Sequence, residues 1–325
     1  MTGNHPECSI VIRAYNEEKH LGRLLEGIAQ QTITDVQTII VDSGSTDGTL
    51  DVASTYDTHI LHISPDEFTF GRSLNRGIAQ AQAEKVVIAS AHVYPVYPDW
   101  LERLLAPFDN PQTGLAYGKQ RGAETSHFSE KQVFIHWYPD ISNMQQDQPF
   151  CNNANLAIRR SLWTEHPFDE TLSGLEDVAW GKWILEQGYH LAYVAEAEVI
   201  HVHNETPRAV FNRYKREAMA FKRIFPQEQF HLGDFVRLVT SNIISDWIEA
   251  GRMKILLRNS RSIFWFRWMQ FWGTYQGYRQ TGPLTAKLRQ TFYYPTKVRL
   301  EQQESPRQVA PIQYNETEIE HHSDV

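Results

Sequence analysis

The sequence predicts an α/β fold with a doubly wound, mostly parallel sheet, followed by a C-terminal helical extension. Three short runs, at Ser9–Ile12, Val36–Val41 and Val86–Ala89, have the apolar, β-branched character of strands buried on both faces. Between these runs, apolar residues recur at helical spacing, first at Leu21, Leu24, Leu25 and Ile28. Strands that alternate with helices over short connections predict parallel βαβ units.

The other elements of the first half follow from the same two periods. A helix is predicted over residues 17–31, and a second one contains Leu74 and Ile78. His59–Ile63 predicts a short strand, and Pro98 stands where a further helix begins. Several such units in a chain of this length favour an open sheet over a closed eight-stranded barrel.

From about Gly114 the alternation of strands and helices loosens. Asn155–Ile158 and Val199–Val202 predict two more strands, with a helix over 176–187 between them. Beyond residue 206 the pattern is helical and rich in aromatic residues, and the last part of the chain has few apolar residues. We therefore expect three regions: an α/β domain over 7–225, a helical extension over 226–292, and a disordered tail over 293–325.

Composition restricts the class of function. The 325 residues are 41% hydrophobic and 22% charged, as in ordinary globular proteins, and the net charge of −8 argues against binding to nucleic acid. Cys8 and Cys151 lie far apart without a metal-ligand spacing, which indicates two buried, reduced thiols. The sequence shows neither a secretory leader nor an apolar run of about 18 residues, so we expect a cytoplasmic protein.

Polar side chains follow directly after the first two predicted strands. Since neighbouring parallel strands end at one edge of a sheet, where nucleotides bind in such folds, we expect these side chains to lie together. A lone Asp42 would be assigned to a capped turn, and Asp47 fits helix capping and nucleotide contact equally well. The expected nucleotide-contacting residues at this edge are Ala14, Asn16, Glu17, Asp42, Ser43 and Asp47.

Two further segments complete an ordered set of motifs. Ser90-Ala91-His92 follows the strand at 86–89, and Gly174-Leu175-Glu176-Asp177 precedes a predicted helix. In order with the segments at 9–18 and 41–49, they resemble the inverting family 2 glycosyltransferases of the GT-A fold, over roughly two-thirds of the chain. The resemblance implies a donor half over 7–118, which binds a nucleoside-diphosphate sugar, and an acceptor half over 119–225.

Ser90, Ala91 and His92 stand where the resembled family usually carries an Asp-x-Asp or a single metal-binding Asp. His92 replaces the metal-ligating carboxylate, and no acidic residue is adjacent to it. Mg²⁺ prefers oxygen ligands, whereas imidazole suits Mn²⁺, Zn²⁺ or similar ions. Two interpretations stay open: His92 binds a divalent metal softer than Mg²⁺, or it contacts the donor diphosphate directly without a metal. The cofactor to be tested is therefore a divalent metal, Mn²⁺ or Mg²⁺.

His201 and His203 end a later strand, where a histidine of the resembled family can complete the metal site. We expect only one of the two to enter the site, on the reasoning that the alternation of side chains along a strand sends their imidazoles to opposite faces. One of them with His92 would make a metal site rich in nitrogen ligands.

The acidic pair Glu176 and Asp177 has two interpretations. Acidic residues in a first helical turn commonly complement the helix dipole. By the resemblance, Asp177 is instead the catalytic base that takes a proton from the acceptor hydroxyl, and Glu176 shapes the acceptor site. Asn153, Asn155 and Trp180 are expected in the same acceptor site, where an amide can hydrogen-bond a sugar hydroxyl.

The segment from Gly71 to Gly77 approximates another pattern of the resembled family. Arg72 or Arg76 is expected to face the donor diphosphate, with Asn75 in the donor site, although a solvated basic helix face is the competing interpretation. Gly114–Lys119 superficially resembles a phosphate-binding loop. We reject that match because one residue is missing between the glycines and Gln120 stands where Ser or Thr must bind magnesium.

These inferences together predict an inverting glycosyltransferase that acts on a glycan or a lipid-linked acceptor. A nucleotidyltransferase of the same fold would need a basic loop after the first strand, where Asn16-Glu17-Glu18 is acidic. A non-catalytic sugar-nucleotide-binding protein is the other alternative, motivated by the missing Asp-x-Asp.

The helical extension crowds aromatic residues among arginines and lysines between residues 230 and 280. Its aromatics either pack as core or form a homo-oligomer interface, or they mark a helix that lies in the headgroup region of an anionic membrane. A helix in the headgroup region would place the protein peripherally at the inner face of the membrane.

Overall fold

The β-branched runs form the strands that the sequence predicts. In the computed structural model, which describes residues 5–203, 205–279 and 309–314, nine strands build one sheet in the order β3-β2-β1-β4-β8-β6-β9-β5, with β7 paired to β9. The first four strands run parallel: β1 (Cys8–Ala14), β2 (Val36–Asp42), β3 (His59–His62) and β4 (Lys85–Ser90).

The second half of the sheet contains the antiparallel strands. β8 (Asn155–Arg159) runs antiparallel to both of its neighbours, β4 and β6 (Thr113–Gly122), and β6 runs parallel to β9 (His190–His201). Two short strands, β5 (Val93–Pro95) and β7 (Asn143–Gln146), pair antiparallel with β9. The mostly parallel α/β sheet that the sequence predicts is therefore confirmed.

Helices cover both faces of the sheet because successive side chains of a strand point to opposite faces. In β1, Ile10 and Ile12 belong to one buried cluster with Leu21 and Trp100, whereas Val11 belongs to a second cluster with Leu74. The covering helices are α1 (Glu18–Ala29), α2 (Thr49–Ser54), α3 (Phe70–Ala79), α4 (Trp100–Leu105), α5 (Phe128–Trp137), α6 (Arg160–Glu165) and α7 (Glu176–Glu186), with 3₁₀ turns at Pro65–Glu67 and Ala106–Asp109.

Strand β6 is the central element that the periodicity does not reveal. The rejected phosphate-loop segment Gly114–Lys119 lies within it. Its glycines interrupt the apolar run but are needed for close packing, since a Cβ atom on Gly118 would lie 2.2 Å from the carbonyl oxygen of Ala197 and 2.3 Å from Nδ2 of Asn155. A strand pattern with glycines of this kind reads as a loop from sequence alone.

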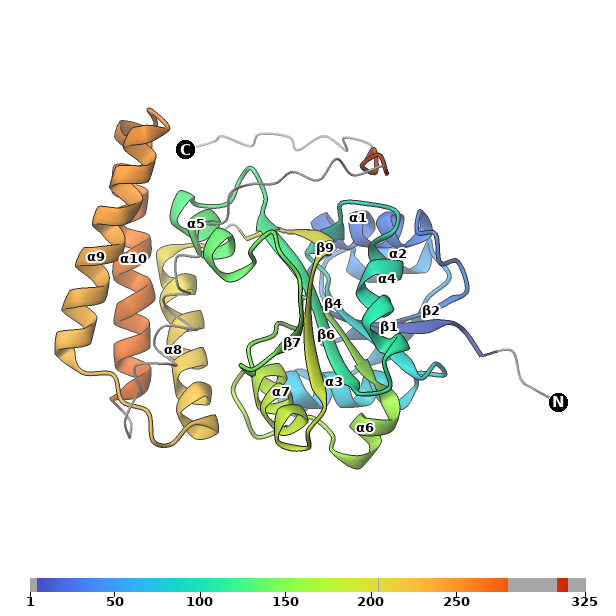
Figure 1. Ribbon diagram of the computed structural model, residues 1–325. Helices are drawn as coiled ribbons and strands as arrows, with labels where there is room; N and C mark the ends of the chain where they lie inside the picture. Colours follow the sequence, from blue (N-terminus) through green and yellow to red (C-terminus); the bar gives the residue numbers. More distant parts are fainter. Residues whose placement is uncertain (1–4, 204, 280–308, 315–325) are drawn as a thin grey trace.

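Three long helices follow the sheet: α8 (Pro207–Ile224), α9 (Leu232–Arg252) and α10 (Leu256–Tyr278). Figure 1 shows α9 and α10 side by side at one edge of the molecule, with α8 between them and the sheet. Gly277 lets α10 approach α8, because a Cβ atom there would lie 2.5 Å from the carbonyl oxygen of Lys215. Two hydrogen bonds of 2.7 and 3.0 Å join the buried Arg267 guanidinium to Asp246 across α9 and α10.

Most of the tail expected over 293–325, and the extension beyond residue 279, lie outside the described residues. Residues 309–314 are described and pack against the edge of the sheet. The amide of Ile312 donates to the carbonyl of Val96 at 3.1 Å, and the Tyr314 ring meets Tyr94 edge to face at 5.1 Å. This part of the predicted disordered tail is therefore ordered by strand-edge and aromatic contacts.

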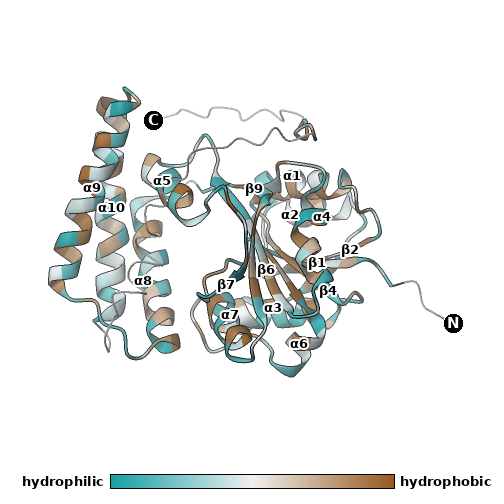
Figure 2. Cartoon of the chain, in the orientation of Figure 1, coloured by the Kyte–Doolittle hydropathy of each residue, from teal (hydrophilic) through white to brown (hydrophobic). Residues whose placement is uncertain are grey.

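Figure 2 shows apolar residues concentrated along the strands, whereas α9 and α10 mix apolar and hydrophilic residues along their length. In the part of the chain that the structure describes, no helix is both long enough and apolar enough to cross a bilayer.

Candidate active site

A cavity of about 500 Å³ opens at the carboxyl ends of β1 and β4 and extends to α7, the end of β9 and α8. Its size is in the range of small-molecule and cofactor sites. Nine residues that the sequence analysis singles out line this cavity: Asn16, Glu17, Ser90, His92, Asn153, Glu176, Asp177, His201 and His203.

The ends of β1 and β2 lie side by side, as expected, with Ala14 in register with Asp42. The carboxylate of Asp42 accepts the amide of Gly44 at 3.0 Å and that of Ser45 at 3.2 Å, which shapes the loop after β2. Asn16 adopts a left-handed conformation, φ 55°, and its Oδ1 accepts the amide of Thr46 at 2.8 Å. The two loops are therefore held together by side chain–backbone hydrogen bonds.

The other residues expected in the donor site at this edge are absent from the cavity lining. Ser43 donates its hydroxyl to the carbonyl of Ala14 at 3.1 Å. Asp47 accepts the amides of Thr49 at 3.1 Å and Glu18 at 3.2 Å, so its carboxylate joins the two loops just before α2 begins. Ala91 is buried at the end of β4, next to the cavity-lining Ser90 and His92. These residues support the edge without lining the cavity.

Asp177 and Glu176 open helix α7 at the far side of the cavity, and both are almost fully buried. Asp177 accepts the amides of Asn153 and Val178, each at 2.8 Å. Burial and the charge of Glu176 raise the pKa of Asp177 to about 7. A carboxylate with a pKa near 7, inside a cavity, has the properties of a general base.

Glu176 is held by two partners from other elements. Its Oε1 accepts Nδ2 of Asn153 at 2.9 Å and Nη1 of Arg13 at 3.1 Å. The preceding Leu175 adopts a left-handed conformation, φ 58°, which is uncommon for a residue with a branched side chain. The turn before α7 is thus strained at the point where it presents the two carboxyl groups to the cavity.

His92, His201 and His203 lie together, with ligand atoms within 4.8 Å of one another. The expectation that His201 and His203 point to opposite faces is wrong. Residues two apart in a strand share a face, and their ring centroids lie only 4.0 Å apart. Both imidazoles therefore face His92, whose ring lies 5.0 Å from that of His201 and 5.5 Å from that of His203.

The Nδ1 atom of each imidazole has an acceptor. It lies 2.7 Å from Glu17 in His92, 2.7 Å from Oε1 of Gln120 in His201, and 2.8 Å from Glu130 in His203. The Gln120 amide is oriented by donation of its Nε2 to Asn152 at 3.1 Å. With Nδ1 protonated toward these oxygens, the unprotonated Nε2 atoms are left as metal ligands.

This arrangement fits a divalent metal. Nε2 of His201 is buried and has no hydrogen-bond partner. Burial and neighbouring positive groups lower the pKa values of His201 and His203 well below the usual histidine value, which keeps both rings in the neutral form that coordinates metals. Three imidazoles without a carboxylate ligand suit Mn²⁺ or Zn²⁺ better than Mg²⁺.

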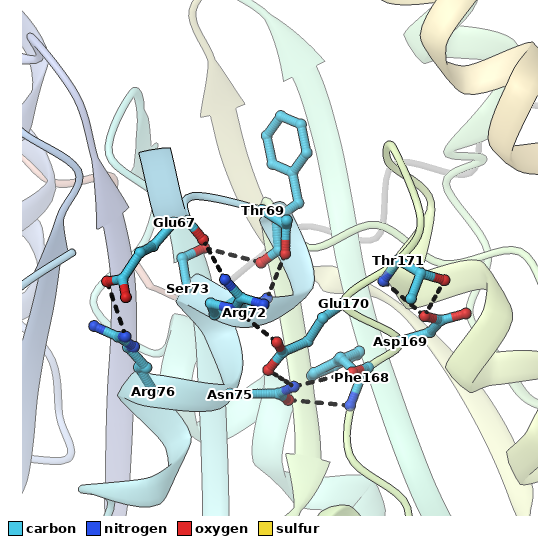
Figure 3. A network of polar contacts seen from close by, with 11 residues as sticks. Glu67, Thr69, Arg72, Ser73, Asn75, Arg76, Phe168, Asp169, Glu170 and Thr171 are labelled. Carbon is cyan, nitrogen blue, oxygen red and sulfur yellow. Dashed lines mark hydrogen bonds and ion pairs between the residues drawn. The ribbon is translucent and has the colours of Figure 1, made fainter. Parts of the chain in front are cut away.

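Arg72 and Asn75 do not line the cavity, and Figure 3 shows both in a network of polar contacts with other residues. Nε of Arg72 donates to Glu170 at 2.7 Å, and its Nη1 donates to the carbonyl of Glu67 at 2.9 Å. Asn75 donates to the carbonyl of Phe168 and accepts the indole N–H of Trp163, each at 2.9 Å. These contacts fix α3 to the loop after α6, so we leave both residues out of the proposed donor site.

Asn155 and Trp180, expected in the acceptor site, are buried and make structural contacts. Asn155 accepts the indole N–H of Trp100 at 2.9 Å and donates to the carbonyl of Ala197 at 2.7 Å. Trp180 donates its own indole N–H to the carbonyl of His166 at 2.7 Å. Neither lines the cavity. Of the three expected acceptor residues, the structure brings Asn153 to it.

The cavity also contains residues that the motifs do not indicate. Arg213 and Arg216 come from α8, one helical turn apart, and Arg13 comes from within β1. The Arg13 and Arg216 guanidinium groups lie 4.9 and 4.5 Å from the ring centroid of Phe70. For Arg213, Arg216 and Glu217, the sequence indicates only that they share one face of a helix, since they are three and four residues apart. His20 also lines the cavity, and nothing in the sequence indicates this beyond its place in α1.

Comparison with known proteins finds glycosyltransferases. The family model described as glycosyl transferase family 2 matches residues 9–164. The chain is 31% identical over 225 residues to the O-antigen chain rhamnosyltransferase WbaN of Salmonella anatum. The aligned region covers 64% of this chain and 70% of the relative. The chain is 29% identical over 221 residues to the O-antigen chain rhamnosyltransferase RfbN of Salmonella typhimurium, with the same coverage.

Solved structures show the same fold. The mannosyltransferase PcManGT of Pyrobaculum calidifontis, in complex with GDP-Man and Mn²⁺, superimposes with a TM-score of 0.56 at 18% identity, over 90% of this chain and 88% of that one. TarS of S. aureus, in complex with UDP-GlcNAc, gives a TM-score of 0.50 at 16% identity, over 84% and 92%. The fold is the GT-A glycosyltransferase fold, and the chain belongs to glycosyl transferase family 2, with the activity of a glycosyltransferase.

Proposed function

We propose that this glycosyltransferase transfers a sugar from a nucleoside-diphosphate sugar to a hydroxyl group of a glycan or lipid-linked acceptor, with inversion at the anomeric carbon. The observation that carries the proposal is the buried Asp177 carboxyl group, whose pKa is raised to about 7 at the wall of the cavity. One such base is sufficient for a single displacement.

In the proposed reaction, the acceptor hydroxyl oxygen attacks the anomeric carbon while the bond from that carbon to the diphosphate breaks. The hydroxyl proton passes to Asp177. The amides of Asn153 and Val178 hold the carboxylate in place, and Glu176 with Arg13 shapes the wall beside it. The acceptor lies on this side of the cavity, next to Asn153.

The donor is proposed to bind at the opposite side, at the ends of β1, β2 and β4. Asn16 and Glu17 line the cavity there, and Asp42 shapes the loop against which the nucleoside would lie. His92, His201 and His203 would hold the divalent metal, which offsets negative charge on the leaving diphosphate when it is bound. All three line the same cavity as Asn16, Glu17 and Asp177, which supports this assignment.

Relatives that the comparisons name as O-antigen chain rhamnosyltransferases support a saccharide acceptor and suggest a deoxyhexose donor. The solved structures with GDP-Man and UDP-GlcNAc support a nucleoside-diphosphate sugar in general. If the acceptor is linked to a lipid, the protein must work at a membrane surface, so a peripheral membrane contact is part of the proposal.

The test begins with a screen of sugar nucleotides for thermal stabilisation of the protein, followed by transfer assays with the best donor. Asp177→Asn should lower the rate of transfer about 10²–10⁴-fold, the usual contribution of a general base. Calorimetry should show nearly unchanged affinity for the nucleoside diphosphate. Asp140→Asn is the matched control, since this exposed carboxylate pairs with Lys119 outside the lining of the cavity. Transfer by Asp177→Asn at the wild-type rate would remove Asp177 from the mechanism.

A further inference from the structure

Large apolar side chains are exposed where α9 and α10 meet. Leu257 is 96% exposed, Met253 56% and Ile248 53%. On the same two helices, Phe264 is 49% exposed and Trp247 38%. The indole N–H of Trp247 in α9 donates to the carbonyl of Ser260 in α10 at 3.4 Å, so the two helices are in contact here. We call these five residues the tip patch: Trp247, Ile248, Met253, Leu257 and Phe264.

The tip patch belongs to a concentration of exposed apolar residues on the hairpin of α9 and α10. Nine of the thirteen large apolar side chains that are exposed in the described part of the chain lie between Leu232 and Trp268. On α10, Leu257, Phe264 and Trp268 are spaced by seven and four residues, so they share one face of the helix. A gathered exposed apolar surface of this kind marks an interaction site.

Positive charge surrounds the tip patch. Between residues 247 and 264, the charged residues are Arg252, Lys254, Arg258, Arg261 and the single acid Glu249, a local charge of +3. The four cationic side chains are exposed, and Glu249 is paired with Arg252 at 3.0 Å. The whole chain carries −8, so this end of the hairpin is opposite in sign to the rest of the protein.

His127 connects the helix that carries part of the tip patch, α10, to the lining of the cavity. His127, at the start of α5, has one ring nitrogen 3.1 Å from the Ser262 hydroxyl of α10 and the other 3.1 Å from the carbonyl oxygen of Glu205, which lines the cavity. Ser262 is five residues from Leu257, about 8 Å along a helix. Figure 1 shows the turn between α9 and α10 at the same end of the molecule as α5.

We propose that the tip patch docks on an anionic lipid surface. Apolar and aromatic side chains would enter the headgroup region, while Arg252, Lys254, Arg258 and Arg261 face the acidic headgroups. A second copy of the chain fits this surface less well, because a two-fold contact would bring the cationic groups of both copies together. The inference deepens the proposed function and rests on it, because a lipid-linked acceptor is the reason why the protein would need a membrane.

The test is sedimentation of the full-length protein with vesicles, without either substrate. We expect binding to phosphatidylglycerol–phosphatidylcholine vesicles at low salt, loss of binding at high salt, and little binding to phosphatidylcholine alone. Each cation near a membrane surface contributes roughly fivefold to binding, so Arg258→Gln with Arg261→Gln should lower partition about 25-fold. Leu257→Ser with Phe264→Ser should lower it as well. Arg237→Gln, an exposed cation near the start of α9, is the matched control and should bind normally.

Absence of binding at low salt, or equal binding to neutral vesicles, would overturn the proposal. Self-association in sedimentation velocity that Leu257→Ser abolishes would assign the surface to a second copy instead. Circular dichroism establishes that the variants fold. Transfer to a water-soluble acceptor is measured separately, so a protein that binds vesicles but transfers no sugar would contradict the proposed function and leave the membrane surface in place.

Discussion

The two sides of the cavity satisfy their polar groups in different ways. On the β1–β2 side, Asn16 and Asp42 accept backbone amides of the neighbouring loop. On the α7–α8 side, burial raises the pKa values of Asp177 and Glu217, and Nε of Arg216 is buried without a hydrogen-bond partner. Buried charges without full compensation cost folding free energy. The difference indicates that the first side is a rigid frame and the second side keeps groups available for chemistry.

Substitution of one of the three cavity histidines should give the largest loss of activity after that of Asp177, the proposed base. His201→Ala removes the central, most buried imidazole of the set. We expect about a 10²–10³-fold fall in transfer rate, the range for removing one group that stabilises developing negative charge. Calorimetry of Mn²⁺ binding to the protein alone should show weaker binding, and excess chelator should abolish transfer in the wild type.

His59→Ala is the control for that prediction, since His59 is exposed on β3. Glu130→Gln probes the support of the site, because Glu130 lies 2.8 Å from Nδ1 of His203. It should lower Mn²⁺ affinity about 10–100-fold, as changes in groups that orient a ligand histidine usually do. Full activity of the wild type in excess chelator would favour direct contact of His92 with the diphosphate instead.

Sequence reasoning succeeded where local pattern and tertiary position agree. The strands β1, β2 and β4 are continuous β-branched runs, and their carboxyl ends could be brought together by topology alone. The pairing of Ala14 with Asp42 follows from that argument. In contrast, β6 was missed because Gly114 and Gly118 serve close packing rather than strand propensity.

The α7–α8 side shows why the rest of the site could not be predicted. Arg13 reads as one more residue of β1, and only tertiary packing brings it to Glu176. Arg216 belongs to no motif, since its role depends on where α8 lies. Asn155 and Trp180 stand close in sequence to cavity residues, yet tertiary packing turns both into the core. The prediction for His201 and His203 was wrong because residues two apart in a strand share a face, a rule that can be applied to the sequence alone.

Asp42→Asn tests whether the β1–β2 side is a frame for the nucleoside. The carboxylate accepts two amides of the loop after β2, and an amide side chain can accept with only one of its two heavy atoms. Loss of such a hydrogen bond should weaken binding of the nucleoside diphosphate about tenfold, with little effect on the pH profile. Calorimetry with free nucleoside diphosphates measures it, and unchanged affinity would remove Asp42 from the donor side.

Glu176→Gln tests the coupling of the two buried carboxyl groups on the other side. The negative charge of Glu176 helps to raise the pKa of Asp177 to about 7, so wild-type activity should fall as pH decreases through about 7 and Asp177 becomes protonated. Removing that charge lowers the pKa of Asp177, and the acidic limb of kcat/KM should move to lower pH. The loss at pH 8 should be small, less than about tenfold. An unmoved limb would show that another group controls it.

Arg216→Gln should have the smallest effect and tests the division of the cavity itself. The guanidinium lines the cavity from α8 and stacks on Phe70, and no carboxylate among the described residues lies within ion-pair distance of it. A cation in this position can donate to an acceptor hydroxyl, and a charged hydrogen bond of about 1.5 kcal/mol corresponds to roughly a tenfold change in binding. We therefore expect the KM for the acceptor to rise up to about tenfold, while kcat and the KM for the donor change little. Arg208→Gln, an exposed arginine in the first turn of α8, is the matched control. If the KM for the donor rises instead, α8 contacts the leaving diphosphate, and the two sides of the cavity do not separate donor from acceptor.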